Sequence, residues 1–160
     1  MCQYYTGQLA AKIYTDGSCN TQLLTGAWVA IIFVGEEKKQ LCGLEENTTH
    51  NRMELTAVIK AIEFLQDHHK NISRVTIYTD SQYVMNLPAR KEKLVALDFS
   101  SKKGKELHNV DIIKRLLQLY ELYTIETIKI KAHQKTNAVN EYNIAADILS
   151  RKMVRQAIKK

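Results

Sequence analysis

The sequence has few of the features that mark exported, membrane-bound or zinc-binding proteins. Cysteine occurs only three times, as Cys2, Cys19 and Cys42, and the spacing is not that of a metal site. This odd number favours a reducing interior over a disulfide framework. The longest apolar run lies between Gly26 and Gly35, far short of the roughly 20 residues that a membrane helix needs. No basic region followed by an apolar one opens the chain, so we expect a cytoplasmic protein that does not contact a membrane.

Internal repeats and low-complexity linkers are also missing. Only one proline and six glycines occur among the 160 residues, and no segment recurs at a solenoid period. Hydrophobic residues make up 45% of the chain, enough for one ordinary core. We therefore expect a tail over residues 1–9 and a single domain over residues 10–160, monomeric and without an obligatory protein partner. The formal net charge of +6 suits a polyanionic partner, although alone it is weak evidence.

Two short segments repeat one design: an apolar run, a threonine, an aspartate and a small turn-forming residue. The first segment, residues 12–18, carries Asp16, and the second, residues 74–81, carries Asp80. An aspartate after a strand is often only a turn former. If the strands are parallel neighbours about 4.8 Å apart, however, both carboxylates stand side by side at one edge of the sheet. Adjacent carboxylates repel unless a positive charge lies between them, so the repetition predicts a divalent metal site.

The order of the elements favours this parallel arrangement. The apolar run at 27–34 and the alternating run at 38–45 continue the first strand as an antiparallel meander. Apolar residues at helical spacing follow from Met53 to Leu65. The strand at 74–78 then returns through a crossover, which makes it parallel to one of the first three strands.

The second half of the chain predicts helices around a basic segment. A helix from Ser81 should end before Pro88, because proline restricts the residue that precedes it. Lysine and arginine dominate residues 88–107, which indicates a protruding basic segment or a solvated loop. The last expected elements are a helix at 109–123 capped by Asn109, a strand at 127–132, a polar loop at 133–140 and a helix through Ile144, Ile148 and Leu149.

Two further acids lie on predicted helices. Glu54 lies four residues before Val58 on the inward face of the first helix, and Asp147 lies between Ile144 and Ile148 on the last. An acid in a first turn often serves only the helix dipole. An acid beside a buried face, however, needs a partner, so both are candidates for coordination.

The four acids lie in motifs that resemble those of the type 1 ribonuclease H family, as in bacterial ribonuclease HI. The motifs are Tyr-Thr-Asp-Gly-Ser around Asp16, Asn-Arg-Met-Glu-Leu around Glu54, Tyr-Thr-Asp-Ser-Gln-Tyr-Val around Asp80 and Asn-Ile-Ala-Ala-Asp-Ile-Leu-Ser-Arg around Asp147. The resemblance implies an α/β fold with a five-stranded mixed sheet, three antiparallel strands then parallel strands, flanked by helices. It also implies endonucleolytic hydrolysis of the RNA strand of RNA–DNA hybrids with two Mg²⁺ per site, for which Mn²⁺ should substitute.

Asp16, Glu54, Asp80 and Asp147 are therefore the predicted metal ligands and catalytic residues. Two ions about 4 Å apart bring four positive charges into a small volume, and four carboxylates neutralise them. Hard cations also prefer oxygen ligands. By resemblance, Glu54 lies near the scissile ribose, and His133 matches a mobile histidine credited with proton transfer or product release. A plain loop histidine is the alternative.

The identity of the fourth acid depends on the alignment. Asn140-Glu141 and Asn143-Ile144 can each match the family's Asn-Glu pair. We adopt the second, because it puts Asp147 in register, whereas the first puts Ile144 at the position of the acid.

The resemblance also implies the nucleic-acid contacts. Thr49-His50-Asn51 matches a turn that contacts the DNA phosphate and the minor groove, and Gln82 matches a groove-reading position. Asn20 is a candidate ribose contact, in a loop that lacks the family's glycines. The basic segment lacks the tryptophans common in bacterial members, so its binding should rest on charge. The cations concerned are Arg90, Lys91, Lys93, Lys102, Lys103 and Lys105.

Two alternatives share this fold: a nucleic-acid-binding module without chemistry, and the nuclease part of a reverse transcriptase. A binding-only protein would not need all four acids. The starting methionine and the short stretch before the first strand disfavour a polymerase fragment and a separate hybrid-binding domain.

Overall fold

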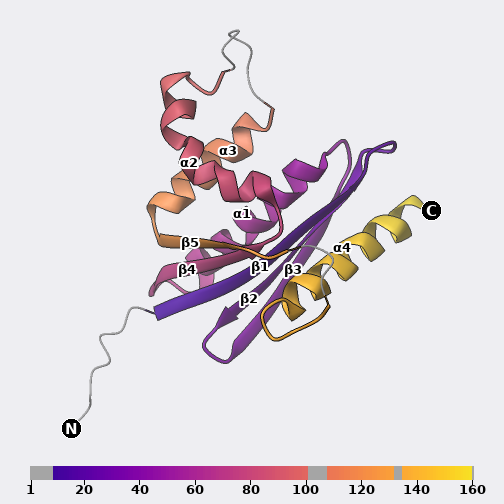
Figure 1. The fold of residues 1–160 in the computed structure, drawn as a ribbon, viewed down its shortest axis with the longest axis horizontal. Helices are drawn as coiled ribbons and strands as arrows, with labels where there is room; N and C mark the ends of the chain where they lie inside the picture. The colour runs from indigo at the N-terminus through magenta and orange to yellow at the C-terminus, as the bar shows by residue number, and fades with distance from the viewer. Residues whose placement is uncertain (1–8, 101–107, 132–134, 160) are drawn as a thin grey trace.

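A mixed sheet forms the centre of the molecule (Figure 1). In this computed structural model, the described residues are 9–100, 108–131 and 135–159. Their five strands have the spatial order β3-β2-β1-β4-β5. The first three form an antiparallel meander, and β4 and β5 run parallel to β1, so the expected topology is confirmed. The strands are β1 (Leu9–Asn20), β2 (Thr25–Val34), β3 (Glu37–Glu45), β4 (Ile72–Thr79) and β5 (Thr124–Lys129).

Helices cover both faces of the sheet. Three lie on one side and the last on the other (Figure 1): α1 (His50–His68), α2 (Gln82–Ala96) and α3 (Val110–Glu121), opposite α4 (Glu141–Ile158). The alternation of side chains along β1 explains this division. Ile13 belongs to the main core with α1 and α3, whereas Tyr14 packs in a smaller cluster with Ala146 of α4. No helix in the described ranges is both long and apolar enough to span a membrane.

α1 is the central helix of the main core. Leu55, Val58, Ile62 and Leu65 are fully buried, and burial of each such side chain contributes about 1.5–3 kcal/mol. The helix begins three residues before the expected Met53, because Thr49 caps it: its Oγ1 accepts a hydrogen bond from the Arg52 N–H at 3.2 Å. Glu54 therefore lies in the second turn.

β1 is longer than expected. It continues four residues past Asp16, because β2 pairs with it antiparallel as far as Asn20. The parallel ladder with β4, however, ends at the pair Tyr14 and Tyr78. Asp16 thus lies inside a strand but just beyond the end of the parallel part of the sheet.

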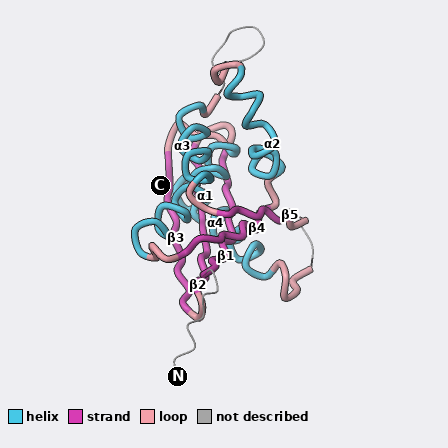
Figure 2. The backbone as a smooth tube through the Cα atoms, turned by 90° about the vertical axis from the view of Figure 1, so that its left-hand side faces the viewer, coloured by secondary structure: helices cyan, strands magenta, loops and turns pink. Residues whose placement is uncertain are grey.

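The prediction that Pro88 ends a short helix is wrong. α2 continues through Pro88 to Ala96, and Leu87 and Leu94 are buried on either side of it. Burial of apolar residues in both halves offsets the loss of one helical hydrogen bond. The first part of the expected basic segment is therefore helical, and the carboxyl-terminal part of α2 projects away from the sheet (Figure 2).

Three further features differ from expectation: one strand boundary, one helix cap and one buried helix face. β5 begins three residues before the expected Thr127. Asn109 adopts a left-handed conformation with φ of 65° and its side chain makes no cap hydrogen bond. On α4 the buried residues include Ala146, Ser150 and Val154, whereas Ile148 is 59% exposed. Ile148 was expected to face the sheet, but it faces solvent. The smaller Ser150 instead occupies the close contact between α4 and β1.

Candidate active site

Asp16 and Asp80 occupy equivalent positions on neighbouring parallel strands. Each lies two residues beyond the last ladder pair, Tyr14 and Tyr78. Glu54 joins them from α1. One carboxylate oxygen of each of these three acids lies within 4.8 Å of the others. The structure therefore brings three of the four predicted acids into one cluster, at the carboxyl ends of β1 and β4.

Glu54 reaches this cluster because α1 crosses very close to β1. A Cβ atom on Gly17 would lie 2.5 Å from the backbone nitrogen of Glu54, so only glycine permits the approach. The side chain of Glu54 is 1% exposed. Its Oε1 lies 3.2 Å from His50 Nε2, and its buried Oε2 has no hydrogen-bond partner. An orphaned buried carboxylate oxygen is unfavourable unless a cation coordinates it.

Burial and mutual repulsion shift the ionisation of the cluster. Burial raises the pKa of Asp16 to about 9, with further increases from the charges of Glu54, Asp80 and Asp147, while a hydrogen bond from Ser150 opposes the shift. Burial also raises the pKa of Glu54, opposed chiefly by the hydrogen bond with His50. A bound cation would reverse both shifts. The cluster thus has oxygen donors that suit a hard divalent ion, and such an ion would supply the positive charge that neutralises them.

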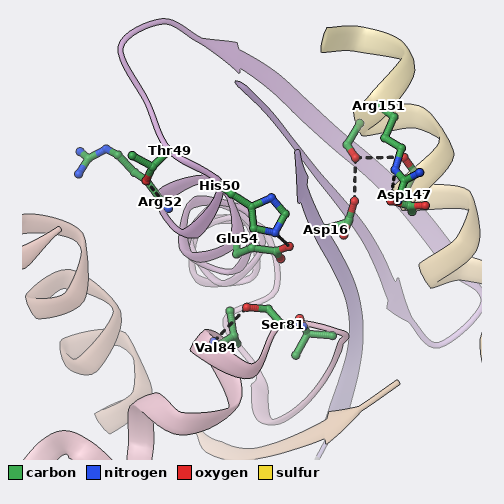
Figure 3. Close-up of polar contacts among 11 residues, drawn as sticks. Asp16, Thr49, His50, Arg52, Glu54, Ser81, Val84, Asp147 and Arg151 are labelled. Atoms are coloured by element: carbon green, nitrogen blue, oxygen red, sulfur yellow. Dashed lines mark hydrogen bonds and ion pairs between the residues drawn. The ribbon is translucent and has the colours of Figure 1, made fainter. Parts of the chain in front are cut away.

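Asp147 lies at the margin of the cluster. Figure 3 shows Asp147 and Arg151 across Asp16 from His50 and Glu54. The Arg151 Nε donates to Asp147 Oδ1 at 3.0 Å. Asp147 lines a small pocket together with Asp80 and Arg151. Its side chain is 34% exposed, and it is not one of the three acids whose oxygens lie within 4.8 Å of one another.

Two polar side chains of α4 fix this helix to the sheet. The Ser150 hydroxyl donates to Asp16 Oδ2 at 2.7 Å and also lies 3.1 Å from the backbone oxygen of Asp147. The Asn143 Nδ2 donates to the backbone oxygen of Tyr78 at 3.0 Å. Asn143 lines the same pocket as Asp147, whereas Glu141 is exposed and does not. This arrangement favours the alignment that takes Asp147 as the fourth acid.

The sequence interpretation quoted Ser150, Asn143 and Gly17 within the motifs but gave none of them a contact in this site. Ser150 follows Asp147 by three residues, which puts both on one helix face, and this spacing was the available signal. The role of Gly17 depends on the crossing of two elements distant in the sequence. Local pattern therefore carried no sign of it.

The predicted nucleic-acid contacts lie mainly at the start of α1. Thr49, His50 and Asn51 are exposed beside the cluster, and the hydrogen bond with Glu54 raises the pKa of His50. Gln82 Oε1 accepts from Lys129 Nζ at 2.5 Å. Asn20 Oδ1 accepts from the backbone N–H groups of residues 22 and 23, which assigns it a role in the turn.

The predicted basic contacts fall into two groups. Arg90, Lys91 and Lys93 lie on α2, where Lys91 Nζ is 2.9 Å from Glu121 Oε1. Four predicted residues lie outside the described ranges: Lys102, Lys103, Lys105 and His133.

Comparison with known proteins agrees with this geometry. A family model described as RNase H matches residues 8–155. A ribonuclease H of Thermoanaerobacter pseudethanolicus is 35% identical over 147 residues, 91% of this chain and 90% of the relative. A ribonuclease H of Acetivibrio thermocellus is 35% identical over 151 residues, 93% of this chain and 97% of the relative.

Solved structures share the fold at lower identity. LC9-RNase H1, described as a type 1 RNase H with the type 2 active-site motif, superposes with a TM-score of 0.77 at 21% identity, covering 94% of this chain and 74% of its own. A foamy viral protease-reverse transcriptase in complex with an RNA/DNA hybrid gives 0.69 at 21% identity, covering 91% of this chain and 20% of its own. Since the family model and both relatives match nearly the whole chain, the protein belongs to the RNase H family and is an endoribonuclease.

Proposed function

We propose that this protein hydrolyses the RNA strand of RNA–DNA hybrids at the acidic cluster, by a two-metal-ion mechanism. The observation that carries the proposal is the meeting of Asp16, Glu54 and Asp80, with ligand oxygens within 4.8 Å of one another and with an unpartnered oxygen on Glu54. The structural neighbour in complex with a hybrid adds support for the substrate class.

The residues present fit a pair of Mg²⁺ ions. All four acids offer oxygen, the donor that hard cations choose, and Mn²⁺ should substitute. Asp16 and Asp80 would hold the central positions, with Glu54 on one side and Asp147 on the other. When bound, the two ions activate the attacking water and stabilise the leaving oxygen.

The chain's own groups position the ligands and the substrate. Ser150 holds one oxygen of Asp16, and Gly17 admits Glu54 to the cluster. The turn from Thr49 to Asn51 would hold the DNA strand, because it lies beside Glu54 and is exposed. His133 would move a proton or release the product. The unit responsible is one domain, residues 10–160, acting as a cytoplasmic monomer.

A substrate panel tests this proposal. End-labelled RNA is supplied as an RNA–DNA hybrid, as single-stranded RNA and as duplex RNA, with labelled duplex DNA as a fourth substrate, each with and without Mg²⁺. The cleaved strand must present 2′-hydroxyls in a shallow minor groove, while its partner must adopt a DNA backbone. We expect internal cuts in the hybrid's RNA only, and only with the ion. Equal rates on duplex DNA, or cleavage in EDTA, would contradict the proposal.

A further inference from the structure

The carboxyl-terminal half of α4 and the C-cap residue that follows it carry four cations to which the sequence interpretation gave no role. From Asp147 to Lys159 no further acid occurs, and the four basic side chains are exposed. We call this surface the α4 basic face; its residues are Arg151, Lys152, Arg155 and Lys159.

The four side chains share one side of the helix. At about 100° per residue, their directions fall within an arc of roughly 100°. The buried residues Ser150 and Val154 point to the opposite side, toward the sheet. From Arg151 to Lys159 the helix rises about 12 Å. The face is therefore a continuous basic strip that borders Asp147.

Three members of the α4 basic face lack an acidic partner, unlike some of the exposed bases elsewhere in the structure. Lys91 pairs with Glu121 and Arg115 with Glu63. On the α4 basic face, Arg151 pairs with Asp147. Among the described residues, no carboxylate forms an ion pair with the other three members of the face. Neighbouring like charges without acids are mildly unfavourable for the free protein, and a polyanion removes that penalty.

The α4 basic face also lies on a new side of the site. Figure 3 shows Thr49 and the first turn of α2, marked by Ser81 and Val84, on the opposite side of Asp16 from Arg151. Apart from Asn20 at the end of β1, the implied contacts within the described residues lie on or beside α1 and α2. A substrate centred on the acids therefore meets α4 on its other flank.

We propose that the α4 basic face binds backbone phosphates of the hybrid on the side of the catalytic acids away from α2. This inference rests on the proposed function, and it extends the substrate contact to a second flank. One strand carries a phosphate about every 3.4 Å along the axis, so a strip of about 12 Å matches three or four of them. Such contacts position the hybrid and carry no sequence information.

The test compares two double variants with equal loss of charge. Arg155→Ala/Lys159→Ala removes the outer half of the face and leaves the pair of Arg151 with Asp147 intact. Lys39→Ala/Lys70→Ala is the control: both lysines are exposed, and both lie near His69 at the far end of α1 from Glu54. Each pair is made in a background carrying Asp80→Asn, and affinity for a fluorescent hybrid is measured by anisotropy over a range of KCl.

Each phosphate contact contributes about 0.9 to the slope of log affinity against log salt. We expect the α4 variant to reduce that slope by about 1 to 2 and the control to leave it unchanged. When the same substitutions are made in protein that keeps Asp80, KM should rise for the α4 variant while kcat is retained. An unchanged slope in the α4 variant, or an equal reduction in the α4 variant and the control, would overturn the inference. The parent's cleavage of hybrid, measured alongside, judges the proposed function separately.

Discussion

Without a cation, the fold disfavours the ionised form of the clustered acids, and Asp16 shows this most clearly. Asp16 is 4% exposed, and its pKa of about 9 exceeds the ordinary value by several units. Between pH 4 and 9, the folded protein therefore keeps a proton that the unfolded chain has released. Stability of the metal-free protein should fall as pH rises through this range.

Asp16→Asn should relieve this effect. Without metal the variant should melt at a higher temperature than the parent, and the difference should grow from pH 4 to pH 9, because asparagine does not ionise. Thermal melting followed by circular dichroism in EDTA measures this. Ser150→Ala is a useful comparison, since it removes the hydrogen bond that stabilises ionised Asp16 and should change stability in the opposite direction. A constant difference across pH would contradict the account of Asp16.

Single substitutions also test the choice of Asp147 over Glu141 as the fourth acid of the site. Asp147 lines the pocket with Asp80, and Glu141 does not. Asp147→Asn should therefore lower kcat and raise the Mg²⁺ concentration needed for half-maximal cleavage, whereas Glu141→Gln should change both less than twofold. A larger metal-dependent defect in Glu141→Gln would show that the other alignment is correct.

At the scale of elements, one close crossing and one ion pair fix α1. Gly17 admits α1 to β1 with no space for a Cβ atom. Gly17→Ala should separate them, cost about 1–3 kcal/mol of stability and weaken Mn²⁺ binding by displacing Glu54. Ser18→Ala, one residue further along β1, is the control. Calorimetric titration with Mn²⁺ and urea unfolding measure both effects, and parent-like values for Gly17→Ala would exclude the role given to this glycine.

The other constraint joins α1 to α3. Arg52 donates to both carboxylate oxygens of Asp111, at 2.7 and 3.0 Å, and this hydrogen bonding lowers the pKa of Asp111 to about 2. Because Asp111 is exposed, Asp111→Asn should cost only up to about 1 kcal/mol at pH 7. The contribution is present above pH 4 and is lost as pH falls through 2. Urea unfolding at both ends of this range checks it; a loss that persists at pH 2 would mean that charge is not the cause.

At the scale of the molecule, the sequence predicted the mixed sheet, the central helix and the meeting of Asp16, Glu54 and Asp80, because these follow from local periodicity and from the repeated strand-acid design. Pro88 misled the prediction: the burial of Leu87 and Leu94 against distant elements outweighs a local rule. Asn109 resembled a helix cap, but its backbone is left-handed. The contributions of Gly17 and Asn143 could not be predicted, since each depends on a contact between segments far apart in the chain.

The central claim is that the clustered acids hold the ions that cleave the hybrid's RNA strand. Single-turnover cleavage by Asp80→Asn, with excess protein and saturating Mg²⁺, tests it most directly, together with hybrid affinity of the same variant. Removal of a shared ligand should reduce the cleavage rate by at least about 10²-fold, which is the lower limit of what an assisting acid or base contributes. Hybrid affinity should stay within a few-fold of the parent's. Cleavage by Asp80→Asn at the parental rate would contradict the account.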